Sequence, residues 1–113
     1  MTISELFRES HETAVSKGWW DKERNPLEIL MLINCELAEV AEEFRKGKPD
    51  KYYSFDQEGN LKPEGYLAEL GDALIRMADF IEQLGCTSKF ELILKEKMDY
   101  NKTRSYRHNG KLY

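Results

Sequence analysis

The segment between residues 26 and 46 constrains the fold most, because its apolar residues recur every three or four positions, as on one face of an α-helix. Asn25 and Pro26 form a helix-start signal, with a capping side chain followed by a proline in the first turn. Lys46-Gly47-Lys48-Pro49 is a stop signal. The expected inner residues are Leu27, Leu30, Ile33, Leu37, Val40, Ala41 and Phe44. So long a stripe predicts a helix that packs against other helices.

Three further helices are expected around it. The first begins at a Thr2 or Ser4 cap and ends near residue 16, before Gly18. Another opens at Pro63 and stops at Gly85, and the last runs from about residue 87 to 102. Residues 47 to about 63 hold glycine and proline breakers without a sustained period, so we expect a loop there, with a turn over 56–60. The predicted fold is one all-α domain over residues 1–113, with a four-helix bundle-like core and a basic tail over about 103–113.

Composition and charge exclude several classes of protein. The net charge of -4 argues against a nucleic-acid polymer as the partner, since phosphate contacts need clustered basic side chains. The longest strongly apolar stretch, Ile29 to Ile33, is far too short to span a membrane, and the first residues lack a signal-peptide pattern. We therefore expect a cytoplasmic protein with no membrane partner.

Two acidic motifs, Glu36-Leu37-Ala38-Glu39 and Glu69-Leu70-Gly71-Asp72, each place two carboxylates one helical turn apart. On a helical wheel both pairs border the apolar stripe of their own helix on the same side, with Glu43 and Asp79 as reserve acids. If the two helices pack antiparallel through these stripes, the four acids converge. The alternative is a solvated acidic face, which is common on surface helices.

Four converging carboxylates would be hard-cation ligands. All-oxygen ligation favours Mg²⁺, with Mn²⁺ as the second choice, over zinc or copper. A carboxylate di-iron site needs Glu-x-x-His pairs, and neither His11 nor His108 has that spacing from a glutamate.

A basic segment follows downstream, interleaved with tyrosines. Within it Lys97, Asn101 and Arg104 are spaced i, i+4 and i+7, so they share one face if the last helix extends that far. They are either a solvated basic face or a site for phosphate oxygens beside a bound metal.

These motifs together resemble the MazG-like group of the all-α nucleoside triphosphate pyrophosphohydrolases. Residues 36–47 resemble the family's first motif region, residues 69–74 its second, and residues 97–104 its C-terminal Lys-x-x-x-Asn-x-x-Arg stretch. The resemblance covers roughly residues 26–111. A departure is the gap of 29 residues between Glu39 and Glu69, at or beyond the long end of the usual spacing. Pairing Glu39 with Glu42 instead would shorten it.

The resemblance implies Mg²⁺-dependent hydrolysis of a nucleoside triphosphate between its α- and β-phosphates, releasing a monophosphate and pyrophosphate. Carried over, Glu36, Glu39, Glu69 and Asp72 hold the metal, and Glu36 or Glu39 activates water. Lys97, Asn101 and Arg104 bind phosphates. Family members are usually homodimers or homotetramers, so homo-oligomerisation is expected to complete the core.

Two points stay open at this level. Trp20, or its neighbour Trp19, is a candidate to stack on the base, although tryptophan is more often core or interface filler. A non-catalytic helical dimer that serves as a binding or regulatory module is the alternative function.

Overall fold

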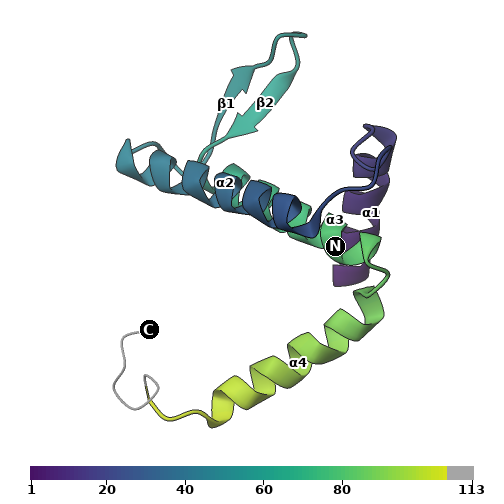
Figure 1. Cartoon of the computed structure of the whole chain (residues 1–113). Helices are drawn as coiled ribbons and strands as arrows, with labels where there is room; N and C mark the ends of the chain where they lie inside the picture. Colours follow the sequence, from purple (N-terminus) through teal and green to yellow (C-terminus); the bar gives the residue numbers. More distant parts are fainter. Residues whose placement is uncertain (107–113) are drawn as a thin grey trace.

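The structure, a computed structural model, describes residues 1–106. It is mostly helical, with one small sheet (Figure 1). The chain order is α1 (Ile3–Ser16), α2 (Pro26–Arg45), β1 (Tyr52–Phe55), β2 (Leu61–Glu64), α3 (Tyr66–Gln83) and α4 (Thr87–Thr103). None of the described helices is long and apolar enough to cross a membrane.

The predicted capping residues start the first two helices. The Thr2 hydroxyl accepts a hydrogen bond from the backbone N–H of Glu5 at 3.1 Å, and the Asn25 carboxamide oxygen accepts one from Leu27 at 2.9 Å. Each cap satisfies a backbone donor that the first helical turn leaves free. The predicted bounds of α1 and α2 are therefore confirmed to within a residue or two.

The segment expected to be a plain loop contains an antiparallel hairpin instead. Tyr52 pairs with Glu64 and Phe55 with Leu61. The predicted turn joins the two strands. It is stabilised by the Asp56 carboxylate, which accepts hydrogen bonds from the backbone N–H groups of Glu58 and Asn60 at 2.9 and 2.8 Å. Strands of four residues are too short to show a period, which is why the pattern missed them.

The third helix begins three residues later than predicted. Pro63 lies in β2, where a two-stranded sheet tolerates its missing N–H, rather than opening α3. Gly65 makes the entry to α3 with a φ of +107°, and a Cβ there would collide with the backbone carbonyl of Asp50. The same carbonyl accepts a hydrogen bond from Leu67 at 3.2 Å, which fixes the end of the hairpin against the helix.

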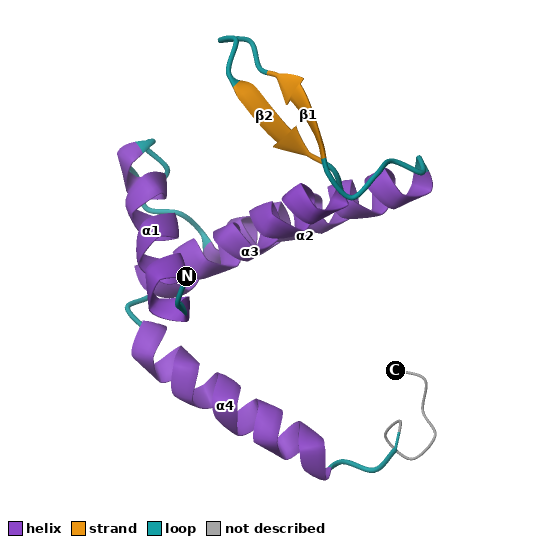
Figure 2. Ribbon diagram, turned by 180° about the vertical axis from the view of Figure 1, so that it is seen from behind, coloured by secondary structure: helices purple, strands orange, loops and turns teal. Residues whose placement is uncertain are grey.

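Three helices form the body of the molecule. α2 and α3 lie antiparallel and side by side, α1 packs across α3, and the hairpin projects from the end where α2 leads into α3 (Figures 1 and 2). The buried apolar residues all come from this body: Phe7, Ile29, Ile33, Val40, Ala73 and Ala78.

α4 does not join that core within one chain. It leaves the end of α3 and runs away from the α2/α3 pair, and it has no buried residue (Figures 1 and 2). It contacts the body near its start only, through a hydrogen bond from the Thr87 hydroxyl to Glu82 and a tilted ring contact between Phe90 and Phe7, with centroids 5.7 Å apart. The four-helix core expected from the sequence is thus a three-helix core with one helix outside it.

Only part of the predicted apolar stripe is covered. On α2, Ile33 and Val40 are buried as expected, together with Ile29, but Leu30 and Leu37 are 46% and 45% exposed. On α3, Leu70 and Leu74 are likewise exposed. The stripe is wider than a single α2–α3 contact can bury.

Candidate functional site

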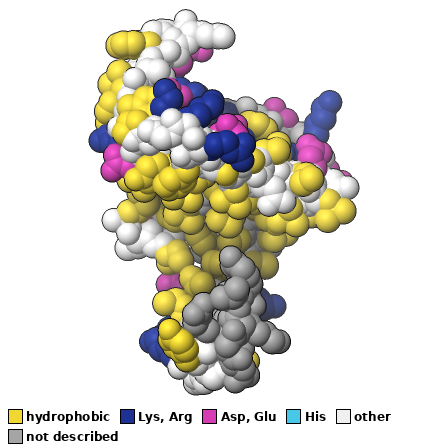
Figure 3. All heavy atoms as spheres, turned by 90° about the vertical axis from the view of Figure 1, so that its left-hand side faces the viewer, with side chains coloured by type: hydrophobic (Ala, Val, Ile, Leu, Met, Phe, Trp, Pro, Cys, Tyr) yellow, Lys and Arg dark blue, Asp and Glu magenta, His cyan; other side chains and the backbone are white. Residues whose placement is uncertain are grey.

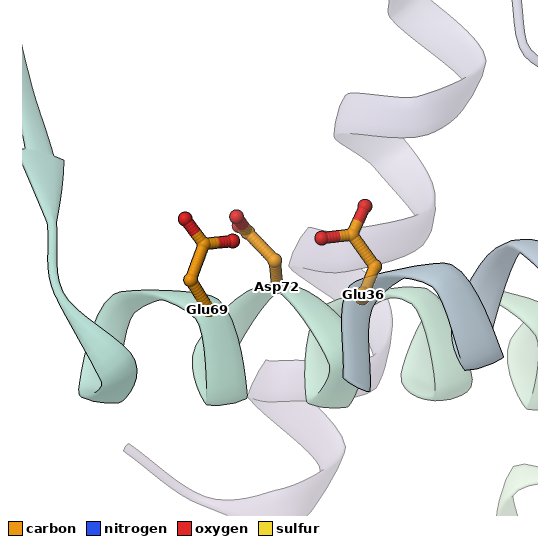
Figure 4. A group of neighbouring side chains, drawn as sticks. All are labelled: Glu36, Glu69 and Asp72. Carbon is orange, nitrogen blue, oxygen red and sulfur yellow. The ribbon is translucent and has the colours of Figure 1, made fainter. Parts of the chain in front are cut away.

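Three of the four predicted acids meet on one side of the α2/α3 pair. Glu36 comes from α2, and Glu69 and Asp72 come from successive turns of α3 (Figure 4). Each offers a carboxylate oxygen, and these oxygens lie within 4.8 Å of one another. The antiparallel packing of the two helices therefore brings their acid stripes together.

Glu39, the fourth acid, is exposed and lies beside Glu69, but it is outside the group of three whose oxygens lie within 4.8 Å of one another. Desolvation, followed by the hydrogen bond and charge of Glu39, raises the pKa of Glu69 from 4.5 to about 7. Desolvation and the Glu36 carboxylate also raise the pKa of Asp72. Carboxylates held this close repel one another, so a proton or a cation is needed to keep them together. The cluster thus favours a positive guest.

Arg76 supplies part of the balancing charge. Its Nε donates to the Glu36 carboxylate at 2.8 Å, and it lies four residues after Asp72 on the same helix face. It also lowers the pKa of Asp72, against the two larger effects above. Lys62 has a smaller effect of the same sign on Asp72, so two positive charges act on the three acids of the cluster and on Glu39 beside them.

A pocket of about 470 Å³ adjoins the acids, between α1, the segment after it, and α3. Glu36 and Asp72 belong to its wall, so the pocket opens onto the cluster. The other lining side chains that matter for binding are Ser10, Lys17, Trp19, Arg24 and Arg76. The guanidinium carbons of Arg24 and Arg76 each lie 5.2 Å from the centre of a Trp19 ring. The pocket combines an aromatic surface with three cations.

Trp20, the predicted stacking residue, is placed differently from its neighbour. Its indole N–H donates to Asp79 at 2.9 Å, and His11 Nδ1 contacts the same carboxylate oxygen at 2.9 Å. These contacts tie α1 and the following segment to α3 behind the pocket. Trp19 rather than Trp20 lines the cavity, and the reserve acid Asp79, which also lines it, is held in this part-buried network.

Two other glutamates of α2 also have their own partners. The Tyr52 hydroxyl donates to Glu43 at 3.1 Å, which links the hairpin to α2, and desolvation with this bond raises the pKa of Tyr52. Glu42 pairs with Arg45 at 2.6 Å. Like Glu39, neither glutamate belongs to the three-acid cluster found among residues 1–106, so only Glu36 of the first acidic motif meets the acids of α3.

The structure does not bring the predicted phosphate-binding residues to the acids within one chain. Lys97 and Asn101 lie on α4, and Arg104 follows its last turn. Lys97 and Arg104 both lie over the Tyr100 ring, at 5.3 and 5.9 Å. Part of the predicted basic tail, residues 107–113, lies outside the described residues.

Sequence reasoning missed Arg24, Arg76 and Lys17 as neighbours of the acids. For Arg76 a signal existed, since it follows Glu69 and Asp72 by seven and four residues and so shares their helix face. Lys17 and Arg24 precede α2 and follow α1, so only the tertiary fold could place them.

The donor set suits a hard divalent cation. Carboxylate oxygens from two helices lie at separations a single ion can bridge, and nitrogen or sulfur ligands are absent from this cluster.

Comparisons of this chain with protein-family models, with curated proteins and with solved structures found no match in any of the three.

Proposed function

We propose that the protein hydrolyses a nucleoside triphosphate between the α- and β-phosphates, giving a monophosphate and pyrophosphate, with Mg²⁺ as cofactor. The observation that carries the proposal is the meeting of Glu36, Glu69 and Asp72 at the mouth of a pocket with aromatic and cationic walls. The likeness of the acidic motifs to the MazG-like family supports the choice of reaction.

Glu36, Glu69 and Asp72 are the proposed metal ligands, and Glu39 lies beside them. When bound, Mg²⁺ would neutralise phosphate charge and lower the pKa of coordinated water. Glu36 keeps one carboxylate oxygen free, because Arg76 bonds to the other. The raised pKa of Glu69 means that binding of the cation must displace a proton from the cluster near neutral pH.

Glu39 is the proposed general base. It is more exposed than Glu36 and has no ion pair among the described contacts, whereas Glu36 is held by Arg76. A carboxylate beside the metal ligands can accept the proton of an attacking water.

The pocket is the proposed site of the nucleoside part of the substrate. Its volume of about 470 Å³ is in the range of small-ligand sites. Trp19 offers a ring 45% exposed, on which a base can stack, and Arg24 and Lys17 offer charge to phosphate oxygens. Lys97, Asn101 and Arg104 would take part only if another copy of the chain carried them to the acids.

A pyrophosphate-release screen tests the proposal. Common and oxidised nucleoside triphosphates are offered with Mg²⁺ and, separately, with a chelator. We expect Mg²⁺-dependent pyrophosphate and monophosphate from at least one of them, lost in Glu39→Ala and Asp72→Ala but retained in Glu42→Ala, a nearby acid outside the cluster. Unchanged turnover in both Glu39→Ala and Asp72→Ala would refute the assignment. Absence of any turnover by folded wild-type protein would favour the non-catalytic binding module instead.

A further inference from the structure

The hairpin stands on the side of the α2/α3 pair to which the acids point. In Figures 1 and 2 it projects from one side of the pair, whereas α4 leaves on the other. Figure 4 shows the end of β2 leading down into α3 on the side where the carboxylates of Glu36, Glu69 and Asp72 lie. The hairpin is therefore a neighbour of the acid cluster.

Along α3 the acids lie between the hairpin and the pocket. Glu69 is in the first turn of the helix, shortly after β2 ends. Asp72 follows one turn later, and the α3 residues that line the pocket run from Asp72 to Asp79. Glu69 and Asp79 are about 15 Å apart along the helix axis, at about 1.5 Å per residue. The hairpin and the pocket thus flank the cluster at opposite ends.

The two faces of the hairpin differ in character. The strand register places on one face Tyr52, Ser54, Lys62 and Glu64. The other face carries Tyr53, Phe55, Leu61 and Pro63. The Tyr52 hydroxyl donates to Glu43 of α2 at 3.1 Å, so the first face is the inner one, directed at the helix pair. The large apolar side chains of the outer face are at least half exposed, and Figure 3 shows hydrophobic side chains on the hairpin at the top of the molecule.

Among the residues of the two strands, Lys62 alone carries a positive charge, and it lies on the inner face. Its charge lowers the pKa of Asp72, so it acts on the cluster across the space between β2 and α3. Its Nζ lies 3.4 Å from Glu64, and its side chain is 57% exposed. An exposed ion pair of this kind is weak, so the ammonium group can turn to a stronger anion.

The order of pocket, acids and hairpin gives a bound nucleotide a direction. With the nucleoside in the pocket, the α-phosphate lies at the near end of the acids, where Lys17 and Arg24 belong to the pocket wall. The β- and γ-phosphates then extend past Asp72 and Glu69 towards the hairpin. Mg²⁺ leaves part of their oxygens without a positive partner, and a lysine ammonium group is a common partner for such oxygens.

We propose that Lys62 binds the β- and γ-phosphates of the substrate, and the pyrophosphate that they form on release, at the hairpin end of the acid cluster. The direction of the nucleotide in this proposal rests on the proposed function. The proposal differs from the phosphate contacts that the family resemblance implies, since Lys97 and Asn101 lie on α4, which leaves the other side of the helix pair.

Calorimetric titration of the full chain with inorganic pyrophosphate in the presence of Mg²⁺ tests the proposal without turnover. Lys62→Met should weaken pyrophosphate binding at least about 10-fold, because it removes a charge-assisted hydrogen bond. Lys62→Arg keeps the charge and should retain most of the affinity. Lys51→Met is the matched control, since the Lys51 Nζ lies 5.2 Å from the centre of the Tyr53 ring, on the outer face of the same hairpin.

A nucleoside monophosphate is the second probe. It lacks the β- and γ-phosphates, so its affinity should be the same in wild type and in Lys62→Met. Equal pyrophosphate affinity in these two proteins would overturn the proposal. So would an equal loss in Lys51→Met, an equal loss of monophosphate affinity in Lys62→Met, or no pyrophosphate binding by folded wild-type protein.

The release assay separates this proposal from the proposed function. A wild-type chain that hydrolyses a nucleoside triphosphate, with the same KM in Lys62→Met, keeps the proposed reaction and refutes the role of Lys62. A chain without turnover whose pyrophosphate affinity still depends on Lys62, and not on Lys51, loses the proposed reaction and keeps the phosphate site at the hairpin.

Discussion

The two sides of the α2/α3 pair differ in how far the rest of the chain covers their side chains. On the acid side, every cluster member has neighbours within the chain, and desolvation together with their shared charge raises the pKa of both Glu69 and Asp72. On the apolar side, leucines at equally regular spacing remain about half exposed. One helix pair therefore carries clustered acids on one side and half-exposed leucines on the other, and substitutions should affect the two sides separately.

The largest expected effect is on the acid side. Asp72→Asn should reduce pyrophosphate release about 1,000-fold, because it removes a charged ligand from the centre of the cluster. The oligomeric mass should not change, since the helical wheel places Asp72 on the side of α3 opposite the exposed Leu70 and Leu74. Light scattering and the release assay on the same preparation check both statements. A change of mass in Asp72→Asn would contradict the claim that the two sides of the helix pair act independently.

The next largest effects concern the stability of the fold, at one buried and one exposed apolar residue of α2. Ile33→Ala should lower the free energy of unfolding by about 3 kcal/mol, because Ile33 is buried within one chain. Leu37→Ala should cost less than about 0.5 kcal/mol in a monomer, but about 1–2 kcal/mol where a second copy covers it. Urea unfolding at two protein concentrations distinguishes the cases, and a concentration-independent, near-zero effect at Leu37 would speak against a covered face.

A smaller effect is expected at the back of the pocket. Trp20→Phe keeps an aromatic ring, smaller than the indole, and removes the N–H that bonds to Asp79, leaving His11 as the remaining partner of this carboxylate. The loss should be about 1 kcal/mol of unfolding free energy. Thermal melts measure it, with Trp19→Phe as the control that keeps the bond. Equal melting of wild type and Trp20→Phe would show that this network does not support the wall.

The smallest effect concerns pH. In the folded chain Glu69 keeps its proton up to about pH 7, whereas an ordinary glutamate loses it near 4.5. The folded state thus binds more protons in this window, so metal-free stability should fall as pH rises through it. Added Mg²⁺ should raise the melting temperature more at pH 8 than at pH 5, and Glu69→Gln should flatten this dependence. A larger Mg²⁺ effect at pH 5 would contradict the raised pKa.

The sequence predicted the helices well where local signals were strong. Asn25-Pro26 and the stop at Gly47 bounded α2, and wheel positions indicated that Glu36 and Asp72 would converge. The hairpin was missed because Tyr52–Phe55 is too short for a periodic pattern, and Pro63 looked like a helix start. Which leucines of the stripe would be buried depends on how many helices cover it. The cations around the pocket, Lys17 and Arg24, were set by tertiary packing alone.

Calorimetric titration of the metal-free protein with Mg²⁺ at pH 8 tests most directly whether the converging acids form a cation site. We expect binding with a dissociation constant of about 1 mM or tighter for wild-type protein and for Glu42→Gln. Binding should be weakened at least about 10-fold in Asp72→Asn and in Glu69→Gln. Equal Mg²⁺ affinity in wild type and both cluster variants, or no binding by folded wild-type protein, would show that the acids meet for another reason.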